Sequence, residues 1–412
     1  MPVAAPRVGV LISEEAGRAD AIYEAGGEPV PIPLPDARPA GGIALVREWV
    51  ADCAQISCAR ENLDGLLISA EEPEELAGFA LAALRLNLPA VAATGGAYLS
   101  AAFAALGLAP LAADPADLLV RVAGEGGPRP LELVEDFTLA NALRAAYSLG
   151  DGPETIVHLS AIAREAGCLG FTQMLRVLVP ETPLLVGPHS GWFEEHGVAG
   201  LLAHLGDILH DTGTVEGHLR EALPSPPPAP PRSVESRLVF VRGRASGVDA
   251  LYRVSGPEKE VTGKCLVCAS EESAVRAVED GGPERGSLLV VGGCGPRGGP
   301  GLLRLGQLRE ALEEAELADS IPVITDGLPP REAHRTWLSL FTPEAAAGGI
   351  IGRLRNGDAL RIDLEEGLIR TGMKAGELER RESYELPNHP GNGYAGRYAS
   401  SALPALEGAG FG

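Results

Sequence analysis

The sequence VVGGCGPRGGPG, residues 290–301, decides how the second half of the chain is interpreted. It contains six glycines and two prolines and continues the apolar run SLLVV of residues 287–291. Glycine allows a backbone to turn at positive φ and to approach a ligand closely. The pattern therefore predicts a strand that runs into a tight loop, and this loop is either an ordinary turn or a binding loop.

Three further segments follow this loop in order. They read IPVITDG at residues 321–327, TPEAAAGG at residues 342–349 and NGDALRID at residues 356–363. The series resembles the C-terminal half of the dihydroxy-acid dehydratase and phosphogluconate dehydratase family, where a GPKGGPG loop precedes ITDG, SPEA and DGD-x-I-x-ID segments. The resemblance implies a second domain that is β-barrel-like and swivels over the first.

The first half of the chain alternates short apolar runs with helical patterns. The run PRVGVLI at residues 6–12 is a strand candidate, and the prolines of residues 26–33 exclude a helix and indicate an extended segment. The run LDGLLIS at residues 63–69 is typical of a buried strand, and residues 42–60 and 75–87 have helical periodicity. Strand and helix alternating at this spacing predict a parallel α/β domain. This half also resembles the family, most closely in residues 141–167 and 182–217, so the resemblance covers almost the whole chain, with deletions.

The fold class we expect is α/β, with an N-terminal parallel α/β/α domain and a C-terminal β-barrel-like domain. The proline-rich sequence PSPPPAPP is typical of an extended connector and marks the boundary. The expected parts are an α/β domain (1–223), a linker (224–236), a β-barrel-like domain (237–384) and a C-terminal segment that packs back on the active-site region (385–412).

The composition excludes several classes of partner. The chain has 412 residues, a net charge of −22 and only 4% aromatic residues, which argues against nucleic acid and anionic membranes. No apolar run approaches the roughly 20 residues of a membrane helix. The N-terminus lacks the features of a signal peptide, and the six cysteines indicate reduced thiols, so we expect a cytoplasmic protein.

The resemblance implies dehydration of a polyhydroxy acid by an iron–sulfur cluster, a divalent metal and a serine base. The first cluster cysteine is expected where SEEAGR stands, at residues 13–18, and the third in a stretch that is deleted between Gly96 and Leu99. The family's C-D-K motif, which supplies a cysteine and two metal ligands, aligns with Glu72, Pro73 and Glu74.

Two more family residues are replaced in the second half. Cys294 stands where the family has a metal-binding glutamate, and LPPR at residues 328–331 replaces the F-S-G motif of the serine base. We therefore expect no cofactor: neither a 2Fe-2S or 4Fe-4S cluster nor magnesium. An alternative is a relocated metal at Cys265, Cys268 and Cys294, although alternating cysteines on a strand are more often core residues.

The catalytic candidates are carboxylates and histidines. Glu72 and Glu74 lie at a loop-to-helix junction, where mutual repulsion would raise one pKa, although an acidic helix start has the same pattern. His158 matches a family helix position that faces the pocket region. His189 falls in a GPHSGW loop where the family has P-S-G, and loops of such folds carry sites.

The substrate-binding candidates come from loops that the resemblance places around the pocket. Arg297 replaces a family lysine and could hold a carboxylate or phosphate. The remaining candidates are Ser190, Thr325, Asp326 and Cys294.

Three functions are compatible with this sequence. The first is a cluster-independent lyase that acts by acid–base chemistry on a small, oxygenated, hydroxy-acid-like molecule, in specialised metabolism. The second is a catalytically inactive dehydratase homologue that binds a ligand or a partner subunit. The third is a metalloenzyme with its metal at the cysteines. The expected partners are a small polar organic substrate and, by resemblance, a second copy of the chain in a homodimer.

Overall fold

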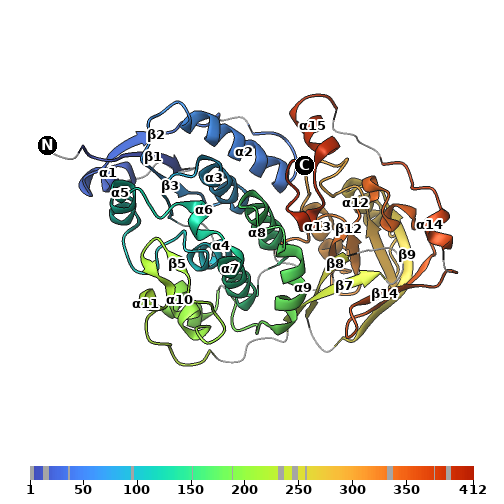
Figure 1. Cartoon of the computed structure of the whole chain (residues 1–412). Coiled ribbons are helices and arrows are strands. Elements are labelled where there is room, and N and C mark those ends of the chain that lie inside the picture. The colour runs from blue at the N-terminus through green and yellow to red at the C-terminus, as the bar shows by residue number, and fades with distance from the viewer. Residues whose placement is uncertain are drawn as a thin grey trace. The chain divides into compact units, whose positions relative to one another are not determined.

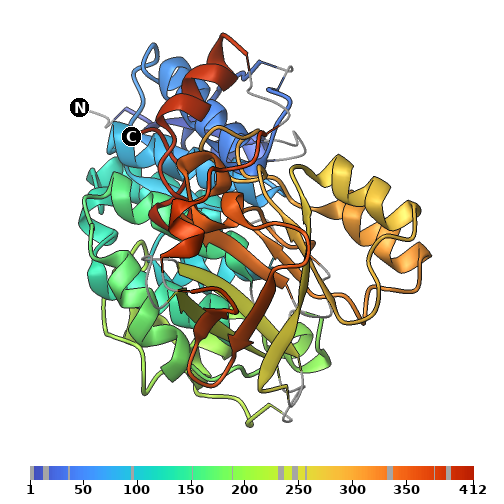
Figure 2. The same ribbon diagram turned by 90° about the vertical axis from the view of Figure 1, so that its right-hand side faces the viewer.

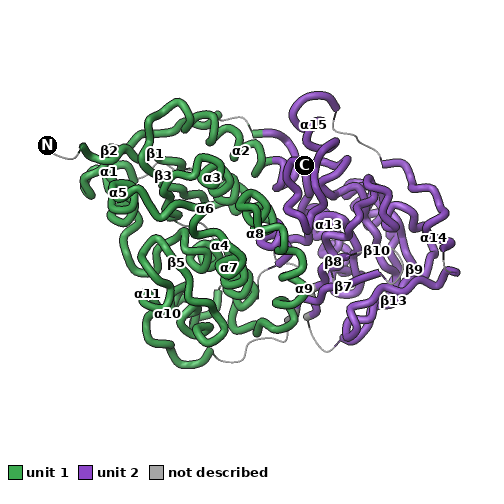
Figure 3. The backbone as a smooth tube through the Cα atoms, viewed as in Figure 1, with its two compact units in different colours: residues 1–38, 46–151, 158–233 green, residues 39–45, 152–157, 234–412 purple. Residues whose placement is uncertain are grey.

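The structure is a computed structural model, and it describes residues 4–12, 18–35, 38–93, 97–150, 152–187, 189–230, 236–243, 249–255, 258–331, 337–374, 376–386 and 391–412. The chain divides into two compact units (Figure 3). Unit 1 contains residues 1–38, 46–151 and 158–233, and unit 2 contains residues 39–45, 152–157 and 234–412.

Unit 1 is built on a parallel sheet of four strands in the order β2-β1-β3-β4. These strands are β1 (Arg7–Ile12), β2 (Glu28–Pro31), β3 (Gly65–Ser69) and β4 (Ala90–Ala92). All five residues of β3 are buried, because a central parallel strand is covered on both faces. This explains why GLLIS is apolar throughout and confirms the predicted α/β class.

Helices cover both faces of this sheet. Helices α1 (Arg18–Glu24) and α5 (Pro115–Glu125) pack on each other and on the sheet, whereas α3 (Pro73–Leu86) packs on β3. Right-handed crossovers from β1 to β2 and from β3 to β4 place α1 and α3 on opposite faces. Helix α3 begins at a proline and ends at Asn87, which has left-handed φ and ψ, so its ends follow from local sequence.

Several further helices of unit 1 pack on one another (Figure 1). Helix α4 is buried from Leu99 onward and packs against α7 and α10, and α7 packs against α9. The remaining elements are α2 (Ile43–Cys58), α4 (Ala97–Ala105), α6 (Pro130–Leu133), α7 (Asp136–Ser148), α8 (Pro153–Glu165), α9 (Phe171–Glu181), α10 (Gly191–His204), β5 (Gly213–Thr214), β6 (Gly217–His218) and α11 (Leu219–Ala222). Residues 43–45 of α2 and 153–157 of α8 are grouped with unit 2.

Unit 2 is a closed barrel of eight strands in the order β10-β11-β12-β8-β7-β14-β13-β9. Strands β9, β10, β11 and β12 pair with one another in parallel, and Leu289 of β10 pairs with Val323 of β11. Strand β12 pairs with β8, and β9 with β13, in antiparallel fashion. The predicted barrel-like domain is therefore confirmed. Its strands are β7 (Ser236–Gly243), β8 (Asp249–Ser255), β9 (Glu260–Cys268), β10 (Ser287–Val291), β11 (Val323–Thr325), β12 (Trp337–Thr342), β13 (Ala359–Asp363) and β14 (Leu368–Thr371).

Strand β10 is buried on both faces. Leu288 and Val290 belong to the core inside the barrel, and Leu289 and Val291 to a second core that includes residues of α12 (Glu271–Glu279) and α13 (Gly306–Glu314). Successive side chains of a strand point to opposite faces, so the apolar run SLLVV serves two cores. Figure 2 shows α12 and α13 side by side on the outside of the barrel.

The leucine spacing of residues 301–318 predicts a helix from residue 301, but the helix observed there, α13, begins only at Gly306. Gly301 and Leu302 both have positive φ, and Arg304 forms a bridge to Leu328. These residues hold the chain in a loop, because a right-handed helix requires negative φ.

The C-terminal segment packs on unit 2. Helix α15 (Tyr394–Ser401) carries Tyr398, which is fully buried and donates a hydrogen bond to the carbonyl oxygen of Ala409 at 2.6 Å. The amide of Gly298 in the glycine-rich loop donates to the carbonyl oxygen of Ala399 at 2.9 Å. Short helical turns complete the unit: η1 (Ala345–Ala347), η2 (Ile350–Arg353), α14 (Glu377–Arg380) and η3 (Ala405–Glu407).

Candidate functional site

The first group of candidate residues lies where β3 ends and α3 begins. Glu72 caps α3 with extended backbone angles, Pro73 follows it, and Glu74 lies in the first turn. Glu72 is exposed, whereas Glu74 is half-buried. Ligands in open parallel sheets usually bind at the carboxyl ends of the strands. The position of Glu72 and Glu74 after β3 is therefore one at which a ligand-binding site is expected.

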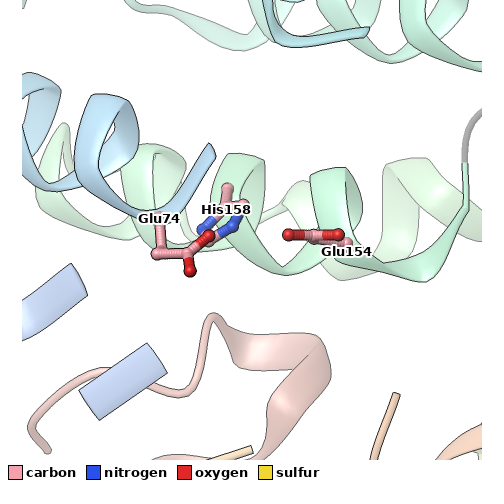
Figure 4. Close-up of side chains that lie close together, drawn as sticks. All are labelled: Glu74, Glu154 and His158. Carbon is pink, nitrogen blue, oxygen red and sulfur yellow. The ribbon is translucent and has the colours of Figure 1, made fainter. Parts of the chain in front are cut away.

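Figure 4 shows Glu74 beside two side chains of α8, Glu154 and His158. One ligand atom from each of the three residues lies within 4.8 Å of the others. Residues four apart on a helix project from the same face, so α8 itself fixes Glu154 beside His158. His158 is fully buried, and the two glutamates are half-buried. Glu74 and His158, predicted separately, are thus brought together by the fold.

Two arginines hold the carboxylate of Glu154. Arg304 forms an ion pair with its Oε1 oxygen, and Arg331 lies 3.6 Å from the same oxygen. The side chains of Arg304 and Glu154 are 22% and 16% exposed, so the pair is largely shielded from solvent and well ordered by comparison with a surface pair. Glu154 is consequently held in one orientation.

His189 and Ser190 lie at the start of α10. The hydroxyl of Ser190 accepts a hydrogen bond from the amide of Phe193 at 3.3 Å and donates one to the carbonyl oxygen of Gly187 at 2.8 Å. Ser190 therefore caps α10. His189 is exposed. Their predicted roles in catalysis and substrate binding stay predictions.

The second group lies in unit 2, at the carboxyl ends of the neighbouring strands β10 and β11. Asp326 follows β11 and is fully buried. Its carboxylate accepts hydrogen bonds from the amides of Gly293 at 3.1 Å, Cys294 at 2.9 Å and Ala345 at 3.0 Å. Burial raises the pKa of Asp326, and these amide donors oppose that rise. Asp326 thus joins the glycine-rich loop to the TPEAAAGG segment.

Glu344 is a second buried carboxyl group in unit 2. Its Oε1 oxygen accepts from the amide of Ala405 at 3.3 Å, which connects it to the C-terminal segment. Within the described residues, Oε2 has no hydrogen-bond partner. Burial, followed by the negative charge of Asp326, raises the pKa of Glu344 to about 7. Glu344 therefore exchanges a proton near neutral pH.

We expect Glu344 to make the stability of unit 2 depend on pH. Its pKa in the folded chain, about 7, lies above the ordinary value of 4.5 for a glutamate side chain. The folded state binds more protons between these values, so the stabilisation is complete below about pH 4.5 and is lost as pH rises through 7. Glu344→Gln, which mimics the protonated form, should be more stable than wild type by about 3 kcal/mol at pH 8.5.

The measurement is urea unfolding of both proteins from pH 4 to pH 8.5, followed by hydrogen exchange in the peptides of unit 2. The difference between the two proteins isolates Glu344 from other titrating groups. A difference in unfolding free energy that stays constant from pH 4 to pH 8.5 would contradict the raised pKa of Glu344.

The other predicted binding residues of unit 2 have structural partners. The hydroxyl of Thr325 accepts from the amide of Gly327 at 2.9 Å. Cys294 is fully buried, and burial raises its pKa well above the ordinary value. Arg297 is exposed. Cys294 and Arg297 lie on the loop after β10, Thr325 ends β11 and Asp326 follows it. Their predicted contacts with substrate stay predictions.

The cysteines do not fit the iron–sulfur cluster that the resemblance implies. Among the described residues, no group of three metal-ligating side chains that includes a cysteine has its ligand atoms within 4.8 Å of one another, whereas a cluster needs several thiolates around one centre. Cys265 belongs to the core inside the barrel, whereas Cys268 and Cys294 belong to the core with α12 and α13. These two cores lie on opposite faces of β9, so the relocated metal at these three cysteines has no common centre.

The remaining positions of the family's ligands do not supply the magnesium site either. Pro73 has no ligand atom, and a buried thiol at Cys294 is a poor partner for magnesium, which prefers oxygen. The loops expected to hold the first and third cluster cysteines include residues 13–17 and 94–96, which lie outside the described residues. Their sequence contains no cysteine.

Two residues of these groups were not among the predicted site residues. Glu154 stands four positions before His158 in a helical pattern, and this spacing was the available signal. Glu344 stands in the TPEAAAGG segment, but its burial beside Asp326 depends on tertiary packing.

The fold and these groups define a class: an α/β protein of two units, with one polar group on α3 and α8 and another at the carboxyl ends of β10 and β11. Residues 227–409 match a family described as "Dihydroxy-acid/6-phosphogluconate dehydratase C-terminal". The chain is 31% identical to a dihydroxy-acid dehydratase of Synechococcus sp. (strain RCC307), over 72% of this chain and 58% of the relative. It is 30% identical to dihydroxy-acid dehydratase 2 of Bordetella bronchiseptica, over 71% of this chain and 55% of the relative.

A third relative is aligned over more of its length. The chain is 26% identical to a dihydroxy-acid dehydratase of Synechococcus sp. (strain CC9605), over 88% of this chain and 82% of the relative. The chain spans little more than half the length of the first two relatives, at 58% and 55%. Residues 227–409 thus match the C-terminal domain of the dihydroxy-acid and phosphogluconate dehydratase family, and the chain is similar to these dehydratases as a shortened, divergent relative. Among the described residues, there is no helix long and apolar enough to cross a membrane.

Proposed function

We propose that this protein is a hydro-lyase that removes water from a small hydroxy acid by acid–base chemistry, without the family's iron–sulfur cluster and magnesium ion. The observation that carries the proposal is the group formed by Glu74, Glu154 and His158, within 4.8 Å of one another. The relatives' names supply the reaction class, because they are dihydroxy-acid dehydratases.

The reaction needs one base and one acid. The base removes the proton on C2, and the electron pair of the broken C2–H bond forms the C2–C3 double bond. The hydroxyl on C3 leaves with a proton from the acid, as water. The enol then takes up a proton on C3 and becomes a 2-oxo acid, so the balance is the loss of one water molecule. A carboxylate and an imidazole in one group provide both proton-transfer partners.

Burial favours this chemistry at these residues. His158 is fully buried, and Glu74 is half-buried. Proton transfer and charge stabilisation are stronger where water is excluded. The ion pair with Arg304 restricts the orientation of the Glu154 carboxylate.

The test is incubation of the purified full chain with a panel of 2,3-dihydroxy acids and sugar acids, including 6-phosphogluconate, in D₂O. Mass spectrometry should detect a 2-oxo acid with one deuterium on C3. Turnover that requires iron and sulfide would overturn the cluster-free reaction. Absence of turnover across the panel, in protein that binds one of these acids, would instead support the catalytically inactive homologue.

We expect Glu74→Gln and His158→Gln to lower kcat by about 100-fold or more, because each removes a proton-transfer group. The matched control is Glu71→Gln, which changes an exposed carboxylate on the same loop. Circular dichroism of each variant checks that the fold is retained. Equal kcat in Glu74→Gln and Glu71→Gln would remove Glu74 from the mechanism.

The proposal includes a cytoplasmic homodimer that works in specialised metabolism. Large apolar side chains on unit 1 are exposed, namely Leu169 at 72%, Val177 at 56% and Phe137 at 54%. Exposed apolar side chains of this size are typical of surfaces that bind another protein. Light scattering after size-exclusion chromatography should give twice the mass of one chain, and the mass of a single chain would overturn the dimer.

A further inference from the structure

We propose that Glu74, Glu154 and His158 bind a divalent transition-metal ion, with Zn²⁺ as the representative ion. Glu74 stands at the position of the lysine in the family's C-D-K motif, whereas Glu154 and His158 do not belong to the set that the family resemblance implies. The inference replaces the expectation that the protein has no cofactor.

The spacing of the three ligand atoms suits one ion. They lie within 4.8 Å of one another. Ligand atoms about 2.0–2.2 Å from a tetrahedral Zn²⁺ ion are about 3.5 Å apart. A small rotation of the side chains therefore brings all three onto a common centre.

The supporting elements make this arrangement rigid. Glu154 and His158 are four residues apart on α8, the spacing by which two residues on one helical face bind a common metal. Glu74 comes from the first turn of α3. Sites on helices hold ligands in more constant positions than sites on loops.

An independent observation concerns the residues behind the ligands. Arg304 pairs with Oε1 of Glu154, and Arg331 lies 3.6 Å from the same oxygen. Carboxylates that bind metals are usually oriented by such outer partners. In a protein that binds no ion, the same two arginines would serve only to neutralise the charge of Glu154. The metal titration described below distinguishes these two roles.

The ligand types select the class of ion. One imidazole nitrogen and two carboxylate oxygens suit Zn²⁺, Mn²⁺ or Fe²⁺, whereas Mg²⁺ and Ca²⁺ prefer oxygen alone. Three protein ligands leave a fourth position for water or substrate, as in catalytic rather than structural zinc sites.

The inference rests on the proposed function and changes the roles of its residues: with the ion bound, Glu74 and His158 would be ligands, and the ion with its bound water would supply the acid and the base. Ion binding is nevertheless measured without turnover. Protein that binds Zn²⁺ but dehydrates none of the acids would overturn the proposed function alone. Protein that dehydrates an acid but binds no ion would overturn this inference alone.

The experiment is titration of the chelator-treated full chain with ZnCl₂ by calorimetry, and with CoCl₂ by absorption spectroscopy. We expect one ion per chain. Cobalt should show visible d–d bands without the intense near-ultraviolet band that thiolate ligands produce, which separates this site from the six cysteines.

The variants are His158→Gln and Glu154→Gln, with His218→Gln as the matched control because His218 is an exposed histidine of unit 1. Loss of one of three ligands should weaken Zn²⁺ binding by at least about 100-fold, and His218→Gln should bind like wild type. Glu154→Gln keeps the test valid if the buried His158→Gln fails to fold. Absence of saturable binding, a thiolate band with cobalt, or wild-type affinity in folded Glu154→Gln would each overturn the proposal.

Discussion

Asp326→Ala should destabilise unit 2 by about 4 kcal/mol, because it leaves three amide donors without an acceptor. The carboxylate of Asp326 is fully buried and accepts from Gly293, Cys294 and Ala345. These amides are less accessible to water than the amides of a surface loop, so water does not readily replace the lost acceptor. We therefore expect faster hydrogen exchange in β10 and β11 and a lower urea midpoint.

The matched control is Asp363→Ala. Asp363 also accepts from two backbone amides, those of Glu365 at 3.1 Å and Glu366 at 2.9 Å. It lies at a solvent-accessible turn, so water replaces the lost acceptor and the urea midpoint should change little. Equal losses in the two variants would show that burial is not the cause.

Gly349→Ala is the second change for which we expect a large effect. An added Cβ would overlap the carbonyl oxygen of Pro343 and lie 2.5 Å from its carbonyl carbon and 2.9 Å from the carbonyl oxygen of Glu344. These are backbone atoms, which move only if the whole turn moves. Overpacking of this kind costs about 3 kcal/mol or more.

Gly348→Ala is the comparison, because at this position the backbone angle is unfavourable for alanine whereas there is space for a Cβ. Gly348 has φ of 77°, and an added Cβ there would meet only Arg353 at 3.8 Å. The left-handed conformation costs alanine about 1 kcal/mol. Urea unfolding should therefore rank wild type above Gly348→Ala and Gly348→Ala above Gly349→Ala. The reverse order would mean that backbone angle, rather than space, limits this turn.

Local sequence predicted most elements of the fold. Continuous apolar runs correspond to β3 and β10, because both strands are buried on two faces. The helix predicted for residues 42–60 is α2, at Ile43–Cys58. The helix expected from residue 301 starts only at Gly306, since Gly301 and Leu302 take positive φ to pack in the loop.

The candidate site was predicted only in part. The sequence singled out Glu74 and His158 one at a time, from a helix start and from a resemblance. Their proximity, and the addition of Glu154, depends on how α3 packs beside α8, which neither segment encodes alone. Asp326 was predicted to bind substrate, and its three amide partners became visible only in the fold.

The sequence by itself determined the α/β class and the family resemblance, and it predicts the loss of the family's cluster residues. All of these depend on residue types and their local periodicity, both of which are visible along the sequence. Only the tertiary structure decided that Cys265 and Cys268 belong to different cores, that Glu344 titrates near pH 7 and that Glu74, Glu154 and His158 form one group. Burial and proximity decide these properties, and both arise from contacts between residues far apart in the chain.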